Sequence, residues 1–446
     1  MELRMSILQK QRLEVLEMSE IDIEAILRQG EGLADEVEVY VSCYEDLSLE
    51  QRQMAVSSVF EHAGQNIYIR VVRDGKIGVS ATSDPTRIAD CMKAAVSSAN
   101  LSDTITGWAG LPQKADIPAG NDPYDESLEI SADTAAEYLS RMNAGAETHA
   151  EARVVTAGVT LMKGSSVLAN SNGVWLERKF TDISLGIDAI CEGSTGYDGD
   201  SAPFASRINP EKIGEQTAFY ATASRNGEMI ESKKYDVVFS ENVVDSLVLE
   251  LFADAVNGRN VLTGKSIYAN HMGEAVASSA LSICDSPMEE AGDSWRRFDT
   301  EGTPTATRDI IKDGVLTSFL YDKKTAAQAG CETTGNALRA GNGTTTISPH
   351  CLTITAPTED VLKRPCLFVK EVIGAHTANP LTGEFSVEVA NAFLAEGGKL
   401  LRPVKKAMLA GNVFEILKGD ISISASAKAF NGALVPMMRI PDLQVI

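Results

Sequence analysis

Hydrophobic and polar positions alternate with the period of a β-strand in several segments of the N-terminal half. Residues 36–41, Glu-Val-Glu-Val-Tyr-Val, place every second side chain on one face of a strand. The two-residue turns Asp74-Gly75 and Asn172-Gly173 tolerate positive φ and predict β-hairpins. The further strands expected from the pattern are residues 67–72, 77–81, 154–162, 167–169, 174–180 and 183–191.

Apolar residues spaced three and four apart predict helices around these strands. Residues 86–100 place Ile88, Cys91, Met92, Ala95 and Val96 on one helical face. A capping sequence, Ser19-Glu20-Ile21-Asp22, predicts a helix that stops at Gly30, and helices are also expected over residues 132–149 and 210–224. The order helix, meander, helix therefore occurs twice, and one interpretation is an internal duplication of the N-terminal half.

The segment Arg225-Asn226-Gly227-Glu228 interrupts both patterns and predicts a domain boundary. After it we expect a strand over residues 235–239, a helix over residues 242–256 and, at Asp313-Gly314, a tight β-hairpin. The fold class expected is α+β with two domains, the first with antiparallel sheets and flanking helices and the second β-rich. The expected limits are an N-terminal extension at 1–18, an α+β domain at 19–228 and a β-rich domain at 229–446.

Composition and charge narrow the functional classes. The chain has 446 residues, 44% of them hydrophobic and 23% charged, which is typical of a globular protein. Its net charge is −22 and its basic residues are scattered, so direct nucleic-acid binding and adhesion to an anionic membrane are disfavoured. Seven dispersed cysteines without a CxxC pair, no signal-peptide pattern and no apolar run long enough to cross a bilayer predict a cytoplasmic protein.

Ordered motifs in the C-terminal half carry a family resemblance. Residues 298–322 read FDTEGTPTATRDIIKDGVLTSFLYD, residues 333–339 read TTGNALR, and residues 369–417 contain EVIG, TGEFS, EGGKLLRPV and AGN. In this order they resemble the TldD/PmbA family of peptidase proteins. The resemblance implies that catalytic members hold zinc with two histidines of an HExxxH helix, whose glutamate activates the metal-bound water.

The corresponding helix in this chain lacks both imidazoles. By the resemblance, the first histidine position is Leu249, the glutamate is Glu250 and the second histidine position is Asp254. No cysteine follows Cys366, and no two of the five histidines share metal-ligand spacing. The resemblance therefore implies the TldE-type branch, with no catalytic residue, no cofactor and no metal in this chain and with zinc in a TldD-type partner.

Two acidic groups remain as candidate sites. Glu250 and Asp254 are four residues apart on one helical face, which suits a hard divalent ion only if several further oxygen ligands join them. Asp299, Glu301 and Gly302 lie in a rigid turn and are candidates for lining a substrate cleft; the alternative is that they only shape the entry to the hairpin.

The function implied by the resemblance is a subunit of a cytosolic TldD/TldE zinc metallopeptidase that degrades or processes peptides and unfolded proteins. Its partner would be a TldD-type sister subunit, or a second copy of this chain in its absence. Three alternatives remain: a self-standing metallopeptidase with a degenerate carboxylate site, a protein-binding regulator of the DNA gyrase modulator type, and a homodimeric peptide-binding module without hydrolysis.

Overall fold

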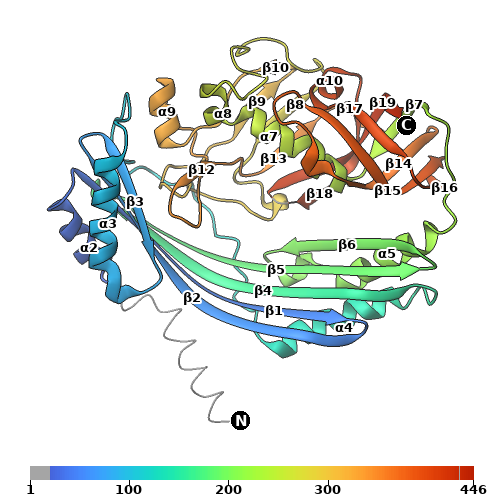
Figure 1. The fold of residues 1–446 in the computed structure, drawn as a ribbon, viewed down its shortest axis with the longest axis horizontal. Coiled ribbons are helices and arrows are strands. Elements are labelled where there is room, and N and C mark those ends of the chain that lie inside the picture. The colour runs from blue at the N-terminus through green and yellow to red at the C-terminus, as the bar shows by residue number, and fades with distance from the viewer. Residues whose placement is uncertain (1–20, 431) are drawn as a thin grey trace.

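The computed structural model describes residues 21–430 and 432–446 (Figure 1). The expected extension at 1–18 and the Ser19 end of the first capping sequence lie outside the described residues. The N-terminal half forms a six-stranded antiparallel sheet and the C-terminal half an eleven-stranded sheet with a two-stranded ribbon beside it. The expected α+β class, with a β-rich C-terminal part, is confirmed.

The six strands of the N-terminal sheet lie in the order β3-β2-β1-β4-β5-β6. The elements are α2 (Ile23–Glu31), β1 (Glu36–Arg52), β2 (Ala55–Arg73), β3 (Lys76–Thr82), η2 (Pro85–Arg87), α3 (Ile88–Leu101), α4 (Ala132–Ala146), β4 (Arg153–Asn170), β5 (Trp175–Cys191), β6 (Ser194–Ala202), η3 (Ala205–Arg207) and α5 (Pro210–Ala223).

This half repeats one topology about the β1–β4 pair. Helix α2, strands β1 to β3 and helix α3 are followed by α4, strands β4 to β6 and α5. Each repeat has its own apolar core between helices and sheet, one with α2 and α3 and the other with α4 and α5. The repeated order that the hydrophobic pattern indicated is thus present in the fold.

Several strands are longer than the pattern indicated. Residues 154–162 and 167–169 belong to one strand, β4, and residues 174–180 and 183–191 to another, β5. The polar link Lys163-Gly164-Ser165-Ser166 stays extended because it is hydrogen-bonded between β1 and β5. Strand β6 was not predicted, since its sequence STGYDGDSA carries no apolar alternation and its pairing with β5 is what makes it a strand.

The C-terminal half is built around a closed ring of five strands. Strands β19, β17, β15, β14 and β7 pair in turn, and β7 pairs back to β19. The elements are β7 (Lys233–Phe239), α6 (Glu241–Val243), η4 (Val244–Leu249), α7 (Glu250–Val256), α8 (Gly258–Leu262), β8 (Ser282–Asp285), η5 (Glu290–Gly292), β9 (Arg308–Lys312), β10 (Val315–Leu316), α9 (Lys323–Ala329), β11 (Ala337–Arg339), β12 (Thr345–Ile347), β13 (Leu352–Thr355), β14 (Cys366–Ile373), η6 (Ala375–Thr377), β15 (Glu384–Glu396), β16 (Lys399–Val404), β17 (Met408–Asn412), α10 (Val413–Lys418), β18 (Ser422–Phe430) and β19 (Ala433–Val445).

The helix expected over residues 242–256 is interrupted. Its central part, η4, is a π-helical turn between α6 and α7. Val244, Leu247, Val248 and Leu249 in this turn are all buried. Because the wider turn depends on packing from the surrounding core, a pattern read at 3.6 residues per turn does not reveal it.

The two faces of the N-terminal sheet have different neighbours. Val37, Val39 and Val41 on β1 face the helices and are fully buried in their core. The alternate positions, such as Glu38 and Tyr40, face the C-terminal half, which lies across the curved sheet in Figure 1. Among the described residues, no helix is both long enough and apolar enough to cross a bilayer.

Candidate functional site

The turn that contains Asp299, Glu301 and Gly302 docks the C-terminal half onto the N-terminal sheet. The Asp299 carboxylate accepts hydrogen bonds from the backbone N–H groups of Glu301 (2.9 Å), Thr303 (2.9 Å) and Ala337 (3.0 Å). Gly302 has a φ of +85°, and a Cβ there would lie 2.7 Å from the Leu168 side chain of β4. The turn therefore needs glycine both for its backbone conformation and for its close approach to the sheet.

Glu301 belongs to a buried set of four charges that we call the interdomain ion cluster: Arg70, Glu38, Glu301 and Arg339. The Arg70 guanidinium pairs with both Glu38 and Glu301. Arg339 Nη2 donates to Glu38 Oε1 at 2.6 Å and to the carbonyl oxygen of Thr300 at 2.8 Å. All four side chains have 3% or less of their surface exposed. Because two cations face two anions, the cluster is neutral overall and joins strands of the two halves.

The electrostatics of the cluster follow from burial and pairing. Burial alone would lower the pKa of Arg70, but the carboxylates of Glu38 and Glu301 raise it above its ordinary value. Burial raises the pKa of Glu301, and the Arg70 charge opposes that rise. Burial and the Glu301 charge together raise the pKa of Asp299. The charged forms of these carboxylates are therefore stabilised by the hydrogen bonds and ion pairs described above and not by water.

Asp299 and Glu301 were expected to line a cleft. Both are buried, with 1% and 0% of their surface exposed, and every partner described above is a structural one. They do not line either of the two cavities described below. Thr300 between them does line one cavity, so Asp299 and Glu301 hold in place the turn that forms part of its wall. A direct contact of these residues with substrate stays a prediction.

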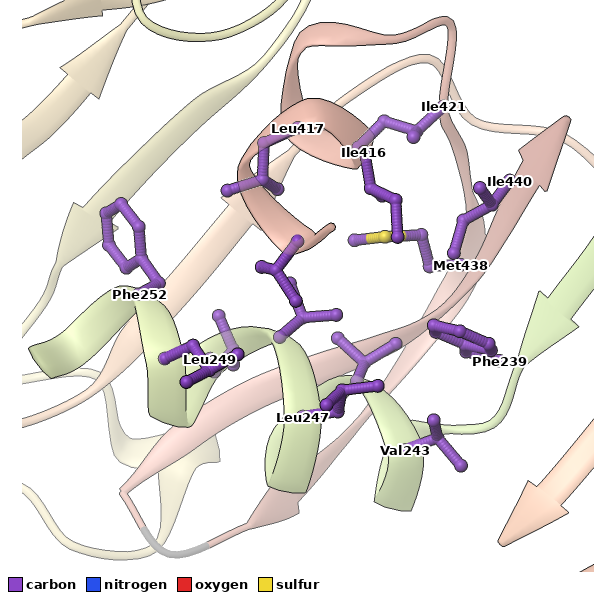
Figure 2. Packing of buried hydrophobic residues seen from close by; sticks show 14 of the residues in the cluster. Phe239, Val243, Leu247, Leu249, Phe252, Ile416, Leu417, Ile421, Met438 and Ile440 are labelled. Atoms are coloured by element: carbon purple, nitrogen blue, oxygen red, sulfur yellow. The ribbon is translucent and has the colours of Figure 1, made fainter. Parts of the chain in front are cut away.

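Of the three positions that the resemblance aligns with the zinc motif, one lies in the core and two lie at the surface. Leu249 is 3% exposed and points into the core that Phe252 and, from α10, Leu417 also fill (Figure 2). Glu250 and Asp254 are exposed one turn apart on α7, and partial burial raises the pKa of Asp254. A buried hydrocarbon and two surface carboxylates do not fit a zinc site, because a zinc site needs three or four converging ligands and Leu249 has no donor atom.

The described histidines are dispersed. His62 lies 3.3 Å from Asp46, His271 lies 2.7 Å from Glu274, and the buried His350 ring lies 2.6 Å from the carbonyl oxygen of Gly335. His149 contacts the Phe219 ring and His376 lies in η6. Within residues 21–430 and 432–446, no group of three or more His, Cys, Asp or Glu residues is placed to hold a metal ion.

A groove lies between the N-terminal sheet and the C-terminal half, and we call it the central groove. It consists of two adjoining cavities of about 340 Å³ and about 300 Å³, and Arg296 and Leu338 line both. In the first, Asn66, Ser42, Ser166 and Arg178 form one row across strands β2, β1, β4 and β5. The remaining wall of this cavity comes from Tyr40, Tyr68, Phe180, Thr300, Arg339, Ala340 and Gly341.

The second cavity continues the groove toward β6 and the loop before β13. It is lined by Asp182, Ser201, Ala202, Pro203, Gly292, Asp293, Ser294, Ser348, Pro349, His350, Ala337, Ala429, Phe430 and Gly432. Burial raises the pKa of Asp182 to about 6. The arrangement of the two cavities is chemically suited to holding an extended polar ligand.

The sequence pattern did not identify the residues of the central groove as a candidate site. The alternation at residues 36–41 shows that Glu38 and Tyr40 share a polar face, but it does not show what covers that face. Their partners Arg296 and Arg339 lie more than two hundred residues further along the chain. Only strand register and the docking of the Asp299 turn bring these side chains together.

Three family models match most of the chain. Models of the PmbA/TldA metallopeptidase domain 1, central domain and C-terminal domain match residues 37–99, 125–225 and 232–446. An uncharacterized protein of Methanocaldococcus jannaschii is 31% identical over 409 residues, covering 91% of this chain and 95% of that protein. Metalloprotease PmbA of Escherichia coli O157:H7 is 25% identical over 437 residues, covering 95% of each chain.

A solved structure has the same fold. The crystal structure of TldE from Thermococcus kodakarensis superposes with a TM-score of 0.85 at 22% sequence identity, covering 95% of this chain and 99% of that chain. At that identity the likeness concerns the fold.

The interdomain ion cluster predicts a large difference between two acidic residues. Replacing Glu301 by glutamine leaves Arg70 buried beside a neutral amide, so we expect a loss of about 3–5 kcal/mol of unfolding free energy. The matched change Glu211→Gln removes an exposed pair with Arg141 and should cost less than about 1 kcal/mol. Urea unfolding followed by circular dichroism measures both, and equal small losses would show that the cluster does not hold the halves together.

Proposed function

Because the chain belongs to the PmbA/TldD metallopeptidase family, we propose that it is the TldE-type subunit of a zinc metallopeptidase complex. In this proposal the chain builds part of the substrate-binding cleft and supplies no zinc ligand. The complex degrades or processes peptides and unfolded proteins in the cytoplasm. Its partner is a TldD-type sister subunit, or a second copy of this chain where that subunit is absent.

The helix that aligns with the zinc motif carries the proposal. Position 249 is a buried leucine in a π-helical turn, and its side chain packs in the core. A leucine side chain has no atom that can bind a metal, so position 249 could supply a zinc ligand only if a histidine replaced the leucine. In this proposal no zinc is bound beside Glu250, so Glu250 has no metal-bound water to activate as a general base.

The long edge of β2 supports a role in an assembly. Residues 55–66 pair with β1, whereas β3 pairs only with residues 67–73, so one edge of this segment is unpaired among the described strands. Val56, Val59 and Phe60 on it are exposed, with Phe60 at 65%. Unpaired strand edges with exposed apolar side chains are surfaces that proteins normally cover.

Zinc analysis distinguishes this proposal from a self-standing metallopeptidase. We expect the purified chain to contain no stoichiometric zinc, because Leu249, Glu250 and Asp254 cannot form a tetrahedral site. Elemental analysis after purification without chelators measures the content. One zinc per chain would show that a metal site exists elsewhere or that these residues have been misassigned.

The aligned glutamate provides a second test. We expect Glu250→Gln to leave the activity of the assembled complex within about twofold of the unsubstituted chain, because a general base acts only beside the water it deprotonates. Folding is checked by thermal unfolding and assembly by gel filtration. Loss of turnover in a folded and assembled variant would make Glu250 a catalytic residue.

Peptide cleavage should depend on the partner. We expect this chain alone to leave a flexible peptide intact and to form a stable complex with a zinc-bearing TldD-type subunit that cleaves it. Co-purification followed by a cleavage assay, with each subunit also assayed alone, tests this. Chelator-sensitive cleavage by this chain alone, or equal activity of the partner without it, is incompatible with the proposal.

A further inference from the structure

Two arginines in the central groove have no acidic partner. Arg178 of β5 and Arg296 of the loop before β9 line the same cavity of about 340 Å³ from opposite halves of the protein. Within the part of the chain that the structure describes, neither forms an ion pair, whereas the nearby Arg70 and Arg339 are balanced by Glu38 and Glu301. Arg70 and Arg339 therefore belong to the interdomain ion cluster, whereas Arg178 and Arg296 have no carboxylate paired with them.

The acidic groups around these arginines are already engaged or lie apart from the cavity. Asp122 pairs with Arg297 at 3.1 Å and accepts the backbone N–H of Lys179 at 2.9 Å. Asp299 accepts three backbone N–H groups, as described above. Asp182 lines the second cavity and not the first. The charges of Asp122 and Asp299 favour the charged forms of Arg178 and Arg296 respectively, but neither carboxylate forms an ion pair with these arginines in the described structure.

The two guanidinium groups are also electrostatically unfavourable to one another. Burial, followed by the nearby charge of Arg296, lowers the pKa of Arg178 to about 9. Burial likewise lowers the pKa of Arg296. The Arg178 Nε atom is buried without a hydrogen-bond partner. Withdrawing two neighbouring cations partly from water is unfavourable unless an anion completes the site.

The rest of the cavity wall defines the kind of anion. Ser42, Asn66 and Ser166 extend the row that begins at Arg178, and their side chains can form hydrogen bonds with a ligand. The Cζ atom of Arg339 lies 4.8 Å from the centroid of the Tyr40 ring. Guanidinium groups match the planar fork of a carboxylate with paired hydrogen bonds. Beyond Arg296 and Leu338 the groove continues into the second cavity.

We propose that Arg178 and Arg296 bind the C-terminal carboxylate of a peptide whose preceding residues lie along the central groove. This inference rests on the proposed function in taking a peptide as the ligand. It adds a direction to binding: the free carboxyl end lies between β5 and the Arg296 loop, and the rest of the chain leads away from it. An amidated peptide would leave both guanidinium groups unpaired.

Direct binding to the isolated chain tests the proposal. The probe is a fluorescently labelled flexible heptapeptide with a free carboxylate, compared by anisotropy with the same peptide amidated at its C-terminus. We expect amidation to weaken binding at least about tenfold, because it removes a charge-assisted contact to two arginines. Arg178→Met and Arg296→Met should each abolish this preference. The control Arg402→Gln, which changes an exposed arginine paired with Glu228, should keep it.

Stability separates a binding role from a structural one. Because Arg178 is unpaired in the free protein, Arg178→Met should leave the thermal midpoint unchanged or raise it, whereas Arg70→Met should lower it. If Arg178→Met unfolds the protein as readily as Arg70→Met, then Arg178 is structural and the proposal is wrong.

The remaining outcomes also decide the question. Equal binding of acid and amide, or a preference that survives both arginine substitutions, overturns the proposal. So does a result in which inorganic phosphate raises the thermal midpoint through these arginines while the peptide acid does not bind, since the ligand is then a free phosphate. Failure of partner-dependent cleavage would remove the proposed function and leave this binding result intact, so the two failures are distinguishable.

Discussion

The buried pairing of Arg70 with Glu38 and Glu301 is the interaction on which the rest of the structure depends. It fixes the turn at residues 299–302 against the sheet, and the same turn holds Arg339 through the carbonyl oxygen of Thr300. Once the turn is docked, the strand face with Tyr40 and Ser42 becomes the floor of a groove instead of an open surface. A neutral cluster can remain buried at this junction because each charge has a partner. Removing one partner leaves a buried charge uncompensated, which lowers the free energy of unfolding.

The arginines of the groove and the helix that the resemblance aligns with the zinc motif differ in their surroundings. Arg178 and Arg296 are half-buried charged side chains that line the groove and form no ion pair within the described residues, and in our proposal they await a ligand. Leu249, at the position where the resemblance places a metal ligand, has instead become an ordinary part of a hydrophobic core. In our proposal the chemistry of this chain is therefore binding and positioning in the groove.

Local pattern was enough to predict most helices, the turns at Asp74-Gly75 and Asp313-Gly314, and the repeated order of the N-terminal half. It failed where partners are distant. Strand β6 has no apolar alternation and exists because β5 pairs with it, and the π-helical turn before Leu249 depends on packing from all sides. The sequence singled out Asp299, Glu301 and Gly302 as a group, but the partner Arg70 lies 231 positions before Glu301. Arg178 and Arg296 looked like ordinary surface arginines, since nothing in their neighbourhoods along the chain shows that they face each other.

The central claim of our proposal is that peptide is held in the groove and not at the helix that the resemblance aligns with the zinc motif. Hydrogen exchange of the isolated chain, followed by mass spectrometry with and without saturating peptide, tests it most directly. The account predicts slower exchange in the loop around Arg296 and Thr300 and in residues 338–341, because these segments wall the occupied cavity. It predicts no change in α7, which carries Glu250 and Asp254. Protection confined to α7, with none in the Arg296 loop, would contradict the account.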